Sequence, residues 1–91
     1  MPEILQLLQY EYVPDIATKR EPHRAGHLSL IEAYHAEGKL VIAGALGNPP
    51  HAGLLAFRTA EDAEAFAAED PYGAAGLVVS HKVEPWTVVA S

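Results

Sequence analysis

The sequence predicts an α+β domain whose elements follow the order β-α-β-β-α-β. Two observations predict this order. Two stretches, 21–38 and 59–69, space their apolar residues as an amphipathic helix does. The rest of the apolar content lies in short runs rich in strand-forming residues and bounded by Gly, Pro, Asn and Asp. These runs are residues 3–13, 39–46, 51–58 and 77–89.

The first half of the chain predicts a strand, a helix and a second strand. Residues 3–13 carry apolar side chains on both faces of the strand. From about Glu21 the spacing becomes helical, with His27 in the middle of the apolar face and Gly38 suited to the helix C-terminus. Residues 39–46 then form a mostly buried strand. One face of the first strand carries Ile4, Leu8, Tyr10 and Tyr12.

The second half predicts a hairpin partner, a helix and a last strand. The Gly-Asn-Pro-Pro break at 47–50 separates the second strand from the third, at 51–58. Thr59 followed by acidic residues suits a helix N-terminus. Residues 70–73 close this helix, and a final strand covers 77–89. The inward face of the helix carries Ala63, Phe66 and Ala67.

This order is the split β-α-β arrangement of ferredoxin-like folds, an antiparallel sheet with both helices on one face. We expect one such domain over residues 1–91. Two helices cover only one face of a four-stranded sheet, yet the first three strands are apolar on both faces. The uncovered face needs a partner, so we expect a homodimer with sheets packed face to face.

Composition excludes several classes of function. Twelve Asp and Glu against six Lys and Arg give a net charge of −6, which repels phosphate backbones, so we expect no nucleic-acid partner. The chain has no cysteine, which excludes disulfides, Zn–thiolate sites and a cysteine nucleophile. The N-terminus has no basic segment of a signal peptide, and its apolar run is too short to cross a bilayer. We therefore expect a cytoplasmic protein without membrane contact.

His27 and Asp70 are the candidates for catalysis. His27 lies mid-way across the apolar face of its helix, and Asp70 continues the inward face of the next helix at helical spacing from Phe66. With both helices on one face of the sheet the two side chains can meet. A carboxylate that orients an imidazole makes a general base near neutral pH. The alternatives are a hydrogen-bonded core histidine and an Asp-Pro turn that only ends the helix.

Arg24 and Tyr72 are the candidates for substrate binding. Arg24 stands one turn before His27 on the same side of the helix, where a guanidinium could clamp an anionic substrate. The alternative is an arginine that extends into solvent. Tyr72 and Trp86 could line an apolar pocket or serve in the core or at a dimer interface.

The histidines are also candidates for metal ligands. His23 and His27 have the i, i+4 spacing that can hold a metal ion, and His35, His51 and His81 are further candidates. No carboxylate completes a recognisable ligand set with them. We expect neither a metal nor a cofactor, with His35 partly buried on its helix and His81 in a strand.

Four short motifs occur in a fixed order along the chain. They are RAGHL at 24–28, EGKLVIAG at 37–44, DPY at 70–72 and VEPW at 83–86. Their order and spacing resemble the YCII-related (YciI-like) family over essentially the whole chain. The family often has Gly-Pro where this chain has Gly44-Ala45, and the loop that follows is short.

The resemblance implies a ferredoxin-like, dimeric α/β-barrel protein with a proposed histidine–aspartate active site, which falls on His27 and Asp70. One branch of the family is similar to lyases that eliminate HCl from chlorinated hydroquinones, and the fold is shared with muconolactone isomerases. We therefore expect a small cofactor-independent enzyme of the lyase or isomerase type, acting on a compact organic anion such as an aromatic or lactone-like one. The alternative is a non-catalytic dimer that binds a small ligand in the same cleft or assists a neighbouring enzyme.

Overall fold

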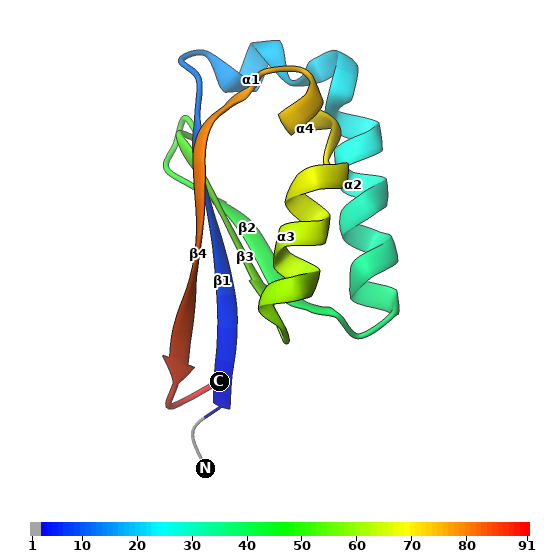
Figure 1. Ribbon diagram of the computed structural model, residues 1–91. Coiled ribbons are helices and arrows are strands. Elements are labelled where there is room, and N and C mark those ends of the chain that lie inside the picture. The colour runs from blue at the N-terminus through cyan, green and yellow to red at the C-terminus, as the bar shows by residue number, and fades with distance from the viewer. Residues whose placement is uncertain (1–2) are drawn as a thin grey trace.

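The computed structural model describes residues 3–91 and has the predicted elements together with two short helices (Figure 1). The strands are β1 (Glu3–Tyr12), β2 (Leu40–Leu46), β3 (Ala52–Phe57) and β4 (Val78–Val88). The helices are α1 (Ile16–Lys19), α2 (Glu21–Ala36), α3 (Ala60–Glu69) and α4 (Pro71–Ala74). Within residues 3–91, no helix combines the length and apolar character that a membrane crossing requires.

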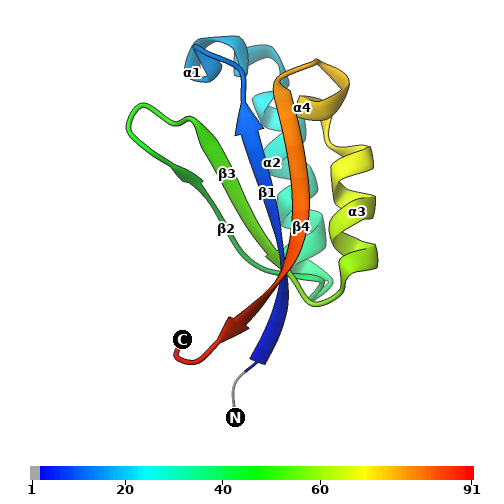
Figure 2. The same cartoon turned by 60° about the vertical axis from the view of Figure 1, so that its left-hand side comes forward.

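The four strands form one antiparallel sheet in the order β2-β3-β1-β4. The two long helices, α2 and α3, lie side by side on one face of this sheet (Figure 1), and Figure 2 shows the opposite face with these helices behind it. Helix α2 connects β1 to β2, and helix α3 connects β3 to β4. In neither case do the two connected strands lie next to each other in the sheet. This topology confirms the α+β, ferredoxin-like fold that the sequence predicts.

The core lies between the sheet and the two long helices. The predicted inward faces supply it, since Leu8 and Tyr10 of β1 and Ala63 and Phe66 of α3 are all buried. Ile4, predicted on the same face as Leu8, is instead 60% exposed. It lies at the end of β1 that extends past the helices (Figure 1), so no helix covers it. The buried cluster comprises Leu8, Tyr10, Tyr34, Leu40, Leu55, Phe57, Ala63 and Phe66.

The helix ends follow local capping chemistry. Thr59 caps α3 as predicted, because its side chain accepts the Asp62 N–H at 3.1 Å. Gly38 has φ of 76°, a left-handed conformation that suits glycine and lets the chain leave α2. Helix α3 ends at Glu69 with Asp70 as its C-cap, as predicted, but residues Pro71–Ala74 form a further short helix, α4, that the sequence did not predict. Four residues carry too little periodicity to reveal a helix in the sequence.

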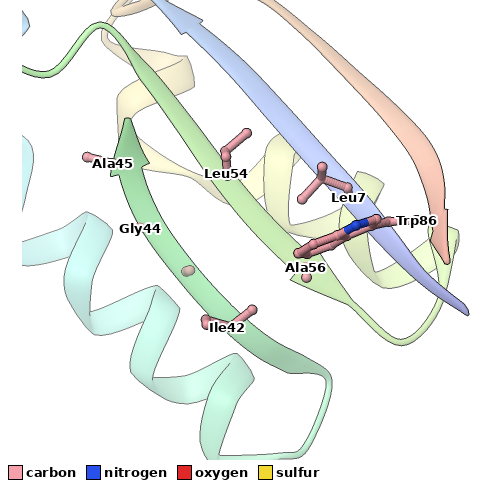
Figure 3. Close-up of a pocket in the computed structure, with 8 residues that line it drawn as sticks. Leu7, Ile42, Gly44, Ala45, Leu54, Ala56 and Trp86 are labelled. Carbon is pink, nitrogen blue, oxygen red and sulfur yellow. The ribbon is translucent and has the colours of Figure 1, made fainter. Parts of the chain in front are cut away.

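The face of the sheet away from the helices is partly apolar, as the sequence predicts. Ile42 is 63% exposed and Trp86 of β4 is 43% exposed. They border a shallow hollow of about 280 Å³, and Figure 3 shows the Trp86 indole over the strands beside Leu7 and Ala56. We call the apolar part of this side the open face. Its residues are Leu7, Ile42, Leu46, Leu54, Ala56 and Trp86.

Candidate active site

The structure brings His27 and Asp70 into direct contact in the layer between the helices and the sheet. His27 Nδ1 lies 2.8 Å from Asp70 Oδ1, and the two residues are only 6% and 1% exposed. His27 comes from the inward face of α2, and Asp70 from the junction of α3 and α4. The two side chains that the sequence places on inward faces therefore meet, while their catalytic role stays a prediction.

Asp70 accepts hydrogen bonds from three donors. Besides His27, the hydroxyl of Tyr10 donates to Oδ2 at 2.8 Å, and the backbone N–H of Tyr72 donates to Oδ1 at 3.0 Å. The last contact makes Asp70 the N-cap of α4. One carboxylate thus serves both as the cap of the turn and as the hydrogen-bond partner of the histidine.

The hydrogen bond to Asp70 fixes which nitrogen of His27 is available. An ionised carboxylate can only accept, so the neutral imidazole carries its proton on Nδ1 and leaves the lone pair of Nε2 free. The ring cannot easily turn, because it stacks on Tyr72 with centroids 3.7 Å apart and packs edge-on against Phe66 at 6.2 Å. The site therefore presents an oriented imidazole with one free basic nitrogen.

Tyr10 remains a hydrogen-bond donor under ordinary conditions. Burial raises the pKa of Tyr10 well above its usual range, and the charge of Asp70 and the hydrogen bond to it raise it further. The phenol therefore keeps its proton at neutral pH and stabilises Asp70 from the side opposite His27. Tyr10 extends the pair into a buried series that runs from β1 to α2 through the α3–α4 junction.

A cavity of about 230 Å³ lies beside His27, between the start of α2 and the strands β2 and β3. Tyr72 forms one wall of it, and Arg24 lies on its rim as a half-buried side chain. Liquid water occupies about 30 Å³ per molecule, so a cavity of this volume has room for a small organic ligand and not only for a single water molecule. The lining residues are Tyr12, Arg20, Arg24, His27, Leu28, Ile31, Ala43, Gly44, Ala45, Leu55 and Tyr72.

The tyrosines that line the cavity are influenced by both arginines. Burial raises the pKa of Tyr72, while the nearby guanidinium groups of Arg24 and Arg20 act in the opposite direction. Burial likewise raises the pKa of Tyr12, and the same two arginines again oppose it. Two cations therefore act on the two phenols at one cavity.

The other sequence candidates lie elsewhere. Trp86 is on the open face, on the opposite side of the sheet from His27, and His23 does not line the cavity. The expectation that His35 is partly buried is wrong, because it lies on the solvent side of the last turn of α2. His81 lies in β4 as predicted, 3.6 Å from Glu64. Among residues 3–91 no group of three His, Asp or Glu side chains is arranged to hold a metal ion.

Sequence reasoning missed Tyr10 and Arg20. A signal existed for Tyr10, because a tyrosine on the inward face of a strand needs a partner for its hydroxyl. Arg20 lies between α1 and α2, where no periodic pattern indicates the direction of a side chain. Only the packing of this turn against β1 and α4 brings it to the cavity.

Comparison with known proteins places this site in a family. The model of the YCII-related domain matches residues 5–87. Protein YciI from Escherichia coli O6:H1 and Protein YciI from Shigella flexneri are each 34% identical to the chain over 86 residues, which is 82% of this chain and 88% of the relative.

Two solved structures share the fold. One is 5-chloro-2-hydroxyhydroquinone dehydrochlorinase from Burkholderia phenoliruptrix, in complex with 2,5-dihydroxybenzoquinone, with a TM-score of 0.72, 23% identity, and coverage of 90% of this chain and 92% of that chain. The other is a protein of unknown function from Nitrosomonas europaea, with a TM-score of 0.57, 21% identity, and coverage of 100% and 93%. The family match spans nearly the whole chain, and the chain therefore belongs to the YCII-related domain family.

Proposed function

We propose that this protein is a small enzyme that works without a cofactor and uses His27 as its general acid and base. Asp70 would orient the imidazole, and Arg24 and Tyr72 would bind the substrate. One observation carries the proposal: the buried series from Tyr10 through Asp70 ends at His27, which lines a cavity together with two arginines.

The chemistry that suits this arrangement is proton transfer. Neutral His27 takes a proton from a carbon or oxygen of the substrate through Nε2, and the resulting imidazolium keeps its Nδ1–H on Asp70. The electron pair left on the substrate then expels a leaving group, which is an elimination, or moves to another atom that takes the proton back, which is an isomerisation. The charge of Asp70 stabilises the imidazolium in either case.

The structural comparison supports the elimination type. The dehydrochlorinase of similar fold removes HCl, by its name, and was solved with a small quinone bound. The cavity beside His27 is of a size for a molecule of that kind. We therefore propose a lyase or isomerase reaction on a small organic molecule with acidic groups.

Nitrogen NMR of the imidazole tests the proposal without a known substrate. We expect neutral His27 to carry its proton on Nδ1. Asp70→Asn should make this preference for the Nδ1-protonated form weaker, because the carboxylate that accepts the Nδ1 proton is lost. Glu69→Gln is the matched control, since it removes the charge of the neighbouring, exposed carboxylate and should leave His27 unchanged.

A His27 that carries its proton on Nε2, or that responds equally to both substitutions, would contradict the role of a general base. The cavity would then be a binding site in a non-catalytic module. In an assay of chloride release from 5-chloro-2-hydroxyhydroquinone, or of a related elimination, His27→Gln should reduce the rate about 100-fold or more. His23→Gln, outside the cavity, should retain the rate.

We also propose that the protein is a homodimer that buries the open face of two copies. Ile42, Leu46 and Trp86 on this face are each more than 40% exposed, with exposures of 63%, 48% and 43%. An exposed apolar area of this kind on a small domain favours association with another protein. A second copy of the same chain is the simplest partner, because most soluble oligomers are homo-oligomers. The hollow of about 280 Å³ beside Trp86 offers space for side chains of the second copy (Figure 3).

A further inference from the structure

Two polar groups at the cavity beside His27 are buried and lack a partner. Tyr72 is 2% exposed, and no residue of the described chain makes a hydrogen bond of good geometry with its hydroxyl, although the Arg24 guanidinium is close enough to lower the pKa of this phenol. The Nε of Arg20 is also buried and unpaired within residues 3–91. Buried polar groups are nearly always satisfied, so two unsatisfied groups at one cavity indicate a missing partner. The Arg20 N–H and the Tyr72 hydroxyl can each donate a hydrogen bond, so both groups suit a ligand that accepts hydrogen bonds.

The charges around the cavity point to the same kind of ligand. The chain carries a net charge of −6, and within its described part Lys39, Arg58 and Lys82 each pair with a glutamate. The remaining cations, Lys19, Arg20 and Arg24, form no ion pair with any residue from 3 to 91, although acidic residues outnumber basic ones twelve to six. Lys19 is exposed to solvent, whereas the two arginines are partly buried. Both instead line the cavity.

We infer that Arg20 and the hydroxyl of Tyr72 form an anion subsite, and that the ligand of this cavity is a small organic acid whose carboxylate or ionised hydroxyl they bind. The inference rests on the proposed function only in taking this cavity as the substrate site. Arg24 adds a second positive charge beside the subsite. An acid held there lies in the cavity that His27 lines, where the imidazole would take a proton from its carbon skeleton.

The subsite also explains why Tyr72 is a tyrosine. Its ring supports His27 by stacking, and phenylalanine would do this equally well. A hydroxyl that is buried without a partner costs free energy unless a ligand satisfies it. The hydroxyl is therefore available to an acceptor in the cavity, with the Arg24 guanidinium beside it.

Calorimetric titration with benzoate and benzamide tests the inference, because the two probes share a shape and differ in charge. We expect benzoate to bind the full chain at least about tenfold more tightly than benzamide does. Arg20→Gln should weaken benzoate about tenfold, since hydrogen bonds to charged groups contribute this much. Tyr72→Phe, which preserves the stacking on His27, should weaken benzoate severalfold and leave benzamide unchanged.

Arg58→Gln is the matched control, because it makes the same change in net charge at an exposed arginine away from the cavity. It should alter benzoate binding less than twofold. Equal affinity for the two probes, equal losses in Arg20→Gln and Arg58→Gln, or no benzoate binding would each overturn the subsite. If Arg20→Gln does not fold, Tyr72→Phe alone decides the outcome.

Failure of the proposed function would be seen differently. If neutral His27 carries its proton on Nε2, its role as general base is contradicted. Benzoate would still bind in that case, and its binding would still depend on Arg20. If the protein is an active enzyme but binds benzoate and benzamide equally well, the anion subsite is contradicted. The proposed role of His27 would then stand.

Discussion

Tyr10 and Asp70 are 60 residues apart in the chain, yet the Tyr10 hydroxyl donates a hydrogen bond of 2.8 Å to Asp70 Oδ2. This contact ties the central strand β1 to the junction of α3 and α4. It occupies the carboxylate oxygen that His27 does not use. Tyr10 is thus a positioning residue, because it holds the group that holds the imidazole.

Tyr10→Phe should destabilise the fold more than Tyr34→Phe does. Both substitutions remove a tyrosine–carboxylate hydrogen bond, but Asp70 is buried whereas Glu69, the partner of Tyr34, is exposed and can be hydrated. We expect a loss of about 1–3 kcal/mol for Tyr10→Phe and about 1 kcal/mol or less for Tyr34→Phe. Urea unfolding measures both, and equal losses would mean that Asp70 finds another donor.

The stability of the protein should fall at alkaline pH, with Tyr10 contributing. Burial and Asp70 raise the pKa of Tyr10 above the value of 10.0 that it has when unfolded. Below pH 10 the phenol is protonated in both states, so its stabilisation is fully present. Above pH 10 only the unfolded chain loses the proton, and the free energy of unfolding falls by up to about 1.4 kcal/mol per pH unit for this group.

Tyr10→Phe lacks this titration, so its unfolding free energy should depend less steeply on pH between about 10 and 11. The measurement is a series of urea unfolding curves for both proteins across that interval. Parallel pH dependences would show that Tyr10 ionises equally in the folded and unfolded chain.

Gly53→Ala should disturb the cavity wall. A Cβ at Gly53 would overlap the hydroxyl of Tyr12, which lines the cavity, so the Tyr12 side chain has to move. Overpacking of this kind costs about 1–3 kcal/mol in unfolding free energy, and it should also weaken benzoate. Gly73→Ala is the control, because a Cβ at this position meets no atom closer than 3.4 Å. The midpoint of thermal unfolding of this variant should stay near that of the wild type.

Leu54→Glu should separate the proposed dimer, since it places a charge in the middle of the open face. Val89→Glu adds the same charge at a residue that is 84% exposed outside that face, and it should leave the assembly unchanged. Sedimentation velocity gives the mass of each variant. The only tryptophan, Trp86, lies on the open face, so its emission should also move to longer wavelength when the dimer dissociates. A wild-type protein that sediments as a monomer would contradict the proposed dimer.

The sequence by itself determined the order of the long elements and the inward placement of His27 and Asp70. Apolar periodicity reports which face of a helix or strand is buried, and this depends on neighbours a few residues apart. The short helices α1 and α4 escaped prediction because four residues hold about one turn of pattern.

The tertiary structure alone decided which groups complete the site. Tyr10 finds Asp70 only because β1 lies at the centre of the sheet beneath the α3–α4 junction. Arg20 reaches the cavity only because the α1–α2 turn folds beside Tyr72. These contacts join segments that are distant in the chain, and no local pattern encodes them. Their physical cause is the closing of the helices over one face of the sheet.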